Sequence, residues 1–134
     1  MQEVIVVLVQ LCLILSAQAL TEEQKDKVTK HGLKCLAETN VDISLVEKGQ
    51  HGEFIDDPLL EEFVYCFLKA SEIIDKDGHP RANKIKEKLS HDATASEINK
   101  FLTKCVPTAS TPQKRAAELW KCYWETSSVH IILQ

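Results

Sequence analysis

The residues best suited to chemistry in this chain of 134 residues are its five cysteines, Cys12, Cys35, Cys66, Cys105 and Cys122. Cysteines can hold a metal ion, act as nucleophiles or form disulfides. A structural zinc site uses pairs of cysteines with only a few residues between them, and the sequence contains no such pair. We therefore expect the cysteines to form disulfides rather than to bind a metal.

The N-terminal segment indicates the compartment in which the cysteines lie. Residues 4–15 are almost entirely apolar, and Ala17-Gln18-Ala19 has the small-x-small form that a signal peptidase accepts. The apolar run is too short to span a bilayer, which takes about 20 residues, and no later stretch is long and apolar enough. We predict a secretory signal peptide over residues 1–19 and a single domain over residues 20–134, located in an oxidising extracellular fluid.

Removal of the signal peptide leaves an even number of cysteines, because Cys12 lies within it. In an oxidising compartment an even set indicates a disulfide framework, and four cysteines allow three pairings. Each of the four falls on the apolar face of a different predicted helix, so each disulfide would join two helices. A cross-link of this kind stabilises a small domain by about 3 kcal/mol. Two of them would allow the interior to contain a ligand-sized cavity of roughly a few hundred Å³.

The elements that must position the cysteines are helices, because apolar residues recur at spacings of three and four and strand patterns are nearly absent. Asp57 before Pro58 is typical of a helix start, and Thr94 with Glu97 has the pattern of a capping box. We expect helices over residues 21–40, over 44–48, from Asp57 to a stop at 75–78, from Pro80, from Thr94 to Cys105, and from Thr111. Without repeats or low-complexity segments, the chain is predicted to form one compact all-α domain.

Motifs of enzymes and of nucleic-acid-binding proteins are not found in the sequence. It has no G-x-S-x-G, no H-E-x-x-H and no glycine-rich phosphate loop. Residues 75–78 begin like a calcium loop, but Pro80 and Lys86 stand where that loop requires glycine and glutamate. The net charge of −4 disfavours a phosphate backbone as partner. We expect no enzyme activity, no cofactor, no metal and no nucleic-acid partner.

Several segments together resemble those of the insect odorant-binding proteins, the general odorant and pheromone-binding family. These are "CLAETNV" at the end of the first helix, the acidic and apolar helix around Cys66, the Asp-Gly stop after it, "KCV", and "KRAAELWKCYW". The resemblance covers essentially the whole chain after the signal peptide. It implies a six-helix fold with an internal hydrophobic cavity and the disulfides Cys35–Cys66 and Cys105–Cys122.

The sequence departs from the family pattern at two cysteines. The family pattern has six, and the two additional positions correspond here to Glu62 and, approximately, to Gln113 or Lys114. The chain therefore resembles the four-cysteine "Minus-C" subclass. The disulfide between the third and sixth helices would be missing, and we expect a more adaptable cavity as a result.

The function that the resemblance implies is that of a secreted carrier. It would reversibly bind small hydrophobic odorants or semiochemicals and transport them through the aqueous fluid of a sensillum, or through hemolymph. Further partners considered are a chemosensory receptor and a second copy of the chain in a homodimer, and no membrane span is expected. The alternatives are a secreted helical signalling or interaction protein with a filled core, and a carrier of the same fold without an olfactory role.

The apolar faces of the predicted helices supply the candidate ligand-binding residues, although such faces also form an ordinary core. Tyr123 could in addition donate its hydroxyl to an oxygen of the ligand. The apolar C-terminal tail, residues 127–134, could close the cavity as a lid, with His130 as a pH-dependent release switch. The candidate lining consists of Val28, Phe63, Phe67, Leu68, Ile85, Leu89, Phe101, Leu102, Leu119, Trp120, Tyr123 and Trp124.

Overall fold

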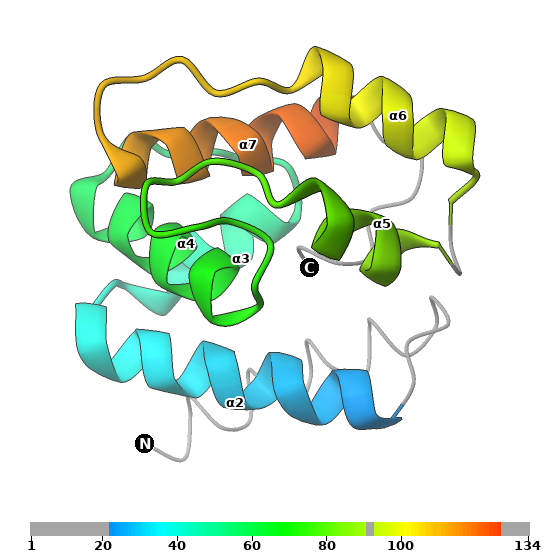
Figure 1. Ribbon diagram of the computed structural model, residues 1–134. Coiled ribbons are helices and arrows are strands. Elements are labelled where there is room, and N and C mark those ends of the chain that lie inside the picture. The colour runs from blue at the N-terminus through cyan, green and yellow to red at the C-terminus, as the bar shows by residue number, and fades with distance from the viewer. Residues whose placement is uncertain (1–21, 91–92, 127–134) are drawn as a thin grey trace.

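The computed structural model describes residues 22–90 and 93–126 (Figure 1). The predicted signal peptide and the predicted lid with His130 lie outside the described residues. The described part is all-α, as predicted, and its extended structure is a single bridge between Ile74 and Pro80. Its helices are α2 (Glu22–Thr39), α3 (Ile43–Gln50), α4 (Pro58–Ala70), α5 (Ala82–Leu89), α6 (Ala95–Lys104) and α7 (Pro112–Thr126).

Two helix starts are fixed by capping residues that the sequence identifies. The carboxylate of Asp57 accepts a hydrogen bond from the backbone N–H of Leu60 at 2.9 Å, and Pro58 occupies the first turn of α4. Thr94 and Glu97 form the reciprocal capping box at the start of α6. Local side-chain chemistry therefore determines where α4 and α6 begin.

The segment between α4 and α5 differs from the prediction. Helix α4 ends at Ala70 rather than near Asp75, because Glu72 has a left-handed backbone with φ of 62°. Helix α5 begins at Ala82 instead of Pro80, since Pro80 is engaged in the bridge to Ile74. Residues 71–81 thus form a loop, which the carboxylate of Asp75 stabilises by accepting backbone hydrogen bonds within it.

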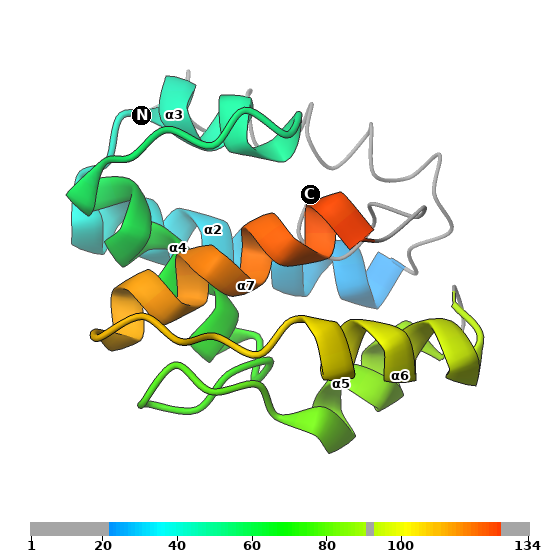
Figure 2. The ribbon, with the colours of Figure 1, turned by 90° about the horizontal axis from the view of Figure 1, so that it is seen from above.

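The helices are arranged around the α4–α7 pair. Helix α4 lies between α2 and α7, and it packs against both (Figure 1). Helix α3 lies on one side of α7, and the mutually packed α5 and α6 lie on the other (Figure 2). Every described helix contributes apolar side chains to the core between these elements, and α2 contributes Cys35. The other helices contribute, among others, Val46, Leu68, Ile85, Ile98 and Leu119.

Two disulfides join helices at opposite ends of this arrangement. Cys35–Cys66 links α2 to α4, and Cys105–Cys122 links the C-terminal end of α6 to α7, each with a Cα–Cα distance of 5.7 Å. These are the pairings that the family resemblance implies. Cys105 is the C-cap residue of α6, so the second disulfide attaches the C-terminal end of α6 to α7.

Helices α4 and α7 carry no disulfide between them and are held by packing, and one arginine links α7 to the loop that follows α4. Arg115 on α7 donates from Nε to the carbonyl of Asp77 at 2.7 Å and from Nη1 to the carbonyl of Ala109 at 2.9 Å. Gly78 lies so close to α7 that an added Cβ would be 2.6 Å from the Pro112 carbonyl oxygen. The 71–81 loop is therefore anchored to the start of α7 without a covalent bond.

Candidate ligand-binding site

Five of the twelve predicted lining residues border one small void. They come from three helices, and Ile73 and Lys88 complete the wall. The void measures about 20 Å³. The five predicted residues are Ile85, Leu89, Phe101, Leu119 and Tyr123.

Helical spacing explains why these side chains meet. Ile85 and Leu89 are four residues apart on α5, and Leu119 and Tyr123 are four apart on α7, so each pair shares one face of its helix. Phe101 reaches the void from α6, and its ring meets that of Tyr123 edge to face, with centroids 5.4 Å apart. All five side chains are buried. The disulfide Cys105–Cys122 holds α6 to α7 beside this contact.

As far as the described residues define it, this void is smaller than the few hundred Å³ that the sequence analysis suggested for a ligand cavity. A space of about 20 Å³ holds roughly one water molecule. The reason is that the rings of Phe101 and Tyr123 pack against each other instead of lining an open space. Disulfides restrain the helices, but they do not keep large side chains apart. A ligand could enter this region only if the helices around it moved apart.

The other predicted residues do not border this void. Phe63 and Phe67 stack on each other within α4, with centroids 6.1 Å apart, and Leu68 is fully buried beside them. Val28 and Leu102 are half-buried against the core. Trp124 lies against Gly52, and Trp120 faces a second hollow.

That second hollow is a groove of about 410 Å³ on the other side of α7, and sequence analysis missed it apart from Trp120. Trp120 packs edge to face against Phe54, with centroids 6.2 Å apart. The groove also exposes Ile55, which is 40% accessible. The apolar pair Phe54-Ile55 in a connecting segment was the available signal. The groove is lined by Gly49, Phe54, Ile55, Asp56, Leu60, Glu61, Val64, Ala109, Lys114, Ala117, Glu118, Trp120 and Lys121.

A histidine on α2 lies on the same side of the core as α5. The ring of His31 meets that of Phe67 edge to face at 6.4 Å. Burial lowers the pKa of His31, and the positive charges of Lys88, Lys34 and Lys27 lower it further, against a smaller opposing effect of Glu72. Positive charge therefore accumulates where α2 approaches α5.

Within residues 22–90 and 93–126, no group of three His, Cys, Asp or Glu side chains could hold a metal ion. None of the helices described is long and apolar enough to cross a membrane.

Comparison with known proteins supports the same fold and class. The PBP/GOBP family model matches residues 17–126. The chain is similar to the B1 protein of Tenebrio molitor, with 33% identity over 116 residues that cover 86% of this chain and 89% of that protein. Among solved structures it is similar to the fatty acid binding protein OBP56a from the oral disk of the blowfly Phormia regina, with a TM-score of 0.69 and 24% identity over 81% of this chain and 95% of that one. The THP12 carrier protein from yellow meal worm has a TM-score of 0.56 and 30% identity over 73% of this chain and 92% of that one.

Proposed function

The chain belongs to the PBP/GOBP family, a family of small-ligand carriers, and from this premise we propose that it transports small hydrophobic odorants or semiochemicals through the aqueous fluid of a sensillum. Residues 1–19 act as a signal peptide in this proposal, and the secreted protein starts at Leu20. The observation that supports a ligand site is the void between α5, α6 and α7, because every wall residue except Lys88 is apolar or aromatic.

The proposed binding step is an opening of this void. No disulfide in the described part of the chain ties α5 to another helix, and α5 packs mainly on α6. Movement of the α5 face away from α7 would separate Ile85 and Leu89 from Leu119. A ligand that buries about 300 Å² of apolar surface gains about 7.5 kcal/mol before ordering costs. This amount suits a carrier with micromolar affinity, which must also release its ligand.

In the opened state the ligand would contact the five residues of the void first and the neighbouring aromatic residues of α4 and α7 as the space enlarges. The hydroxyl of Tyr123 would then donate a hydrogen bond to an oxygen of the ligand. The other predicted lining residues become ligand contacts only to the extent that the helices separate.

The test is binding of N-phenyl-naphthylamine to the secreted, oxidised protein, followed by displacement with volatile esters and alcohols. Two variants locate the site. Leu89→Phe places a phenyl ring in the wall of the void, and Ala117→Phe places a phenyl ring in the wall of the groove. We expect Leu89→Phe to weaken probe binding at least tenfold and Ala117→Phe to change it less than twofold, with circular dichroism as the control for folding.

A specific observation favours a second candidate function. In the described part of the chain, a void that holds about one water molecule also fits a filled core, as expected for a secreted interaction or signalling protein. Unchanged probe emission with the wild-type protein would favour that candidate. Loss of binding in Ala117→Phe alone would instead move the ligand site to the groove.

A further inference from the structure

One buried polar atom belongs to the wall of the groove and has no hydrogen-bond partner. Among the described residues, two buried side-chain polar atoms lack a partner, Nε1 of Trp120 and Oε1 of Gln50, and of these residues only Trp120 lines the groove. Trp120 is 4% exposed. An indole N–H can only donate, and a buried one usually has an acceptor, because an unpaired buried donor is unfavourable. Trp120 therefore offers a donor that nothing in the described part of the chain accepts.

The orientation of the indole ring places this N–H on the α3 side of the groove. The atoms Cζ2 and Cη2 of Trp120 lie next to Gly49, since a Cβ added to Gly49 would be 3.9 Å from each. Cζ2 and Nε1 are bonded to the same ring carbon, so the N–H is adjacent to the ring edge that contacts Gly49. Gly49 itself lines the groove, and it has no side chain to place over that edge.

A ligand reaches the N–H only if a neighbouring side chain moves, because Nε1 is buried. The side chain best placed to move is that of Phe54. Its half-buried ring meets Trp120 edge to face, with centroids 6.2 Å apart, and it comes from the irregular segment between α3 and α4. Connecting segments move more readily than packed helices. The groove beside it measures about 410 Å³, which is within the size range of small-ligand sites.

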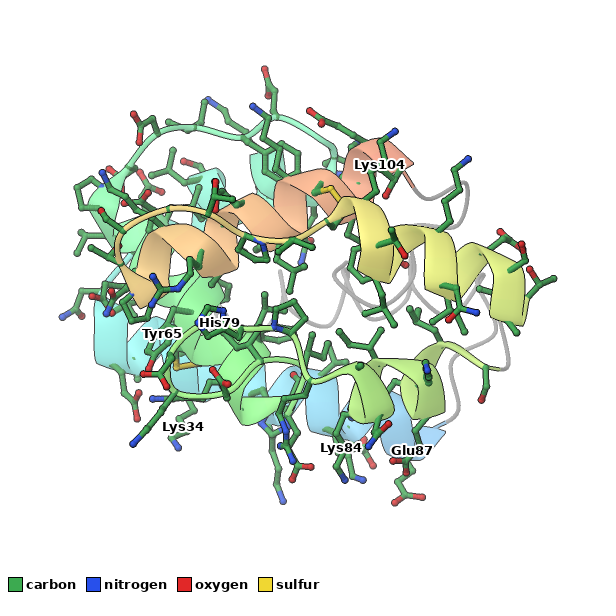
Figure 3. All side chains as sticks on the ribbon, turned by 45° about the horizontal axis from the view of Figure 1, so that its top comes forward. Lys34, Tyr65, His79, Lys84, Glu87 and Lys104 are labelled. Carbon is green, nitrogen blue, oxygen red and sulfur yellow. A yellow bond between two sulfur atoms is a disulfide. The ribbon has the colours of Figure 1, made fainter. Side chains whose placement is uncertain are left out.

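The charges around the groove do not favour an anionic ligand. The charged lining residues are Asp56, Glu61, Glu118, Lys114 and Lys121. Carboxylates outnumber lysines among them, so positive charge is not in excess there. Figure 3 shows Lys34 and Lys84 on a different part of the surface, the edge of the molecule formed by α2 and α5. Burial of an unpaired charge against the apolar part of the groove would also be unfavourable. The acceptor for the indole N–H is therefore expected on a neutral molecule.

We propose that the groove is a second ligand site, separate from the void, for neutral compounds that carry a carbonyl oxygen on an apolar body. The carbonyl oxygen accepts a hydrogen bond from Nε1 of Trp120, and the apolar body lies against Phe54, Leu60 and Val64. A hydrocarbon of the same shape makes the apolar contacts but leaves the indole N–H without an acceptor. This site does not depend on the carrier function proposed for the void.

The test uses acetophenone and α-methylstyrene, which have nearly the same shape and differ in a carbonyl oxygen against a methylene group. Each compound is titrated into the secreted, oxidised, ¹⁵N-labelled protein, and the indole N–H signals are followed by NMR. The chain has two tryptophans, so Trp120→Phe assigns the two signals. We expect acetophenone to move the N–H proton signal of Trp120 downfield until it saturates, as a new hydrogen bond does. The signal of Trp124 should move much less, and α-methylstyrene should give no downfield shift.

Three variants locate the site, with the backbone amide signals as the measure of affinity. Ala117→Phe in the wall of the groove should weaken acetophenone binding at least tenfold, whereas Leu89→Phe in the wall of the void should change it less than twofold. Trp120→Phe keeps an aromatic ring without the N–H. It should lower the ratio of the acetophenone affinity to the α-methylstyrene affinity about fivefold, as loss of one hydrogen bond would.

The outcomes separate this second site from the carrier function. An unmoved Trp120 signal at the highest soluble concentration of acetophenone would overturn the inference, and so would an affinity ratio that is unchanged in Trp120→Phe. If Leu89→Phe rather than Ala117→Phe weakens acetophenone, the compound binds in the void, so the second site fails while the carrier function stands. If N-phenyl-naphthylamine does not bind but acetophenone shifts the Trp120 signal as expected, the carrier function fails and the second site stands.

Discussion

Two hollows beside α7 in the described part of the chain differ in size and in the composition of their walls, and we propose the smaller one as the ligand site of the carrier function. The groove of about 410 Å³ has partly exposed walls that include charged side chains. The void of about 20 Å³ is lined by buried apolar and aromatic side chains together with the half-buried Lys88. We favour the void because of the composition of its wall and the movement proposed for α5, and not because of its volume.

The two hollows also differ in how firmly their walls are held. Helix α4 forms one wall of the groove and α7 forms another, and the two helices pack closely on each other. The connection between α6 and α7 is held at Glu118, whose carboxylate accepts the backbone N–H groups of Thr108 and Ala109 at 2.9 and 3.0 Å. Around the void, α5 has no such link to α7 in the described residues. The expectation of an adaptable cavity stays a prediction, and these contacts favour the α5 side over the α4–α7 contact as the place of movement.

The largest expected difference between the two regions is in the cost of removing an aromatic ring. Phe101→Ala at the void should lower the free energy of unfolding by about 3–5 kcal/mol, because the ring is buried against Tyr123. Phe54→Ala at the groove should cost about 1–2 kcal/mol, because its ring is only half-buried. Urea unfolding measures both, and equal costs would contradict the contrast between a buried wall at the void and a partly exposed wall at the groove.

Removing the disulfide beside the void should have the next largest effect. The double substitution Cys105→Ser with Cys122→Ser opens the loop that this disulfide closes, whose ends are 17 residues apart in the sequence. It should lower the free energy of unfolding by about 3 kcal/mol. Because this disulfide holds α6 to α7 at the wall of the void, probe affinity should fall as well. The matched control is Cys35→Ser with Cys66→Ser, which should lower stability by a similar amount and leave the probe affinity of the folded fraction nearly unchanged.

Gly78→Ala tests the close, non-covalent contact between the 71–81 loop and the start of α7. Gly78 has φ of 79°, and an added Cβ would lie 2.6 Å from the Pro112 carbonyl oxygen. The substitution should cost about 1–2 kcal/mol or slightly more, since a left-handed backbone is unfavourable for alanine and the loop must also shift. A thermal or urea midpoint equal to that of the wild type would show that the loop is not fixed to α7.

The smallest expected effect is the pH dependence contributed by His31. Its pKa in the folded protein lies below the ordinary value of 6.5, mainly because of burial and then because of Lys88, Lys34 and Lys27, with Glu72 opposing. The unfolded chain therefore binds the proton of His31 more readily than the folded protein does. The stability that neutral His31 contributes is complete above about pH 6.5, and it is lost as the pH falls through the lower pKa of His31 in the folded protein. The wild type should lose more stability than His31→Gln between pH 7.5 and 5.5 in urea unfolding. Parallel losses would contradict this role of His31.

Comparison of prediction and structure shows which inferences depend on local sequence. The starts of α4 and α6 were predicted from Asp57, Thr94 and Glu97, because a cap is an interaction within one turn of helix. The end of α4 was placed too late, because the left-handed backbone at Glu72 has no strong signal in the residue type. Helical spacing correctly identified buried faces, but it could not separate residues around the void from Phe63 and Leu68, which pack elsewhere in the core.

By itself the sequence determined the all-α class, the helix starts and the apolar faces, because these depend on contacts between residues a few positions apart. Only the tertiary structure decided that residues from α5, α6 and α7 close on a small void, and that Trp120 faces a groove on the opposite side of α7. The physical reason is that a hollow is the space left between side chains of distant segments. Its volume depends on how those side chains pack together, which no single helix specifies.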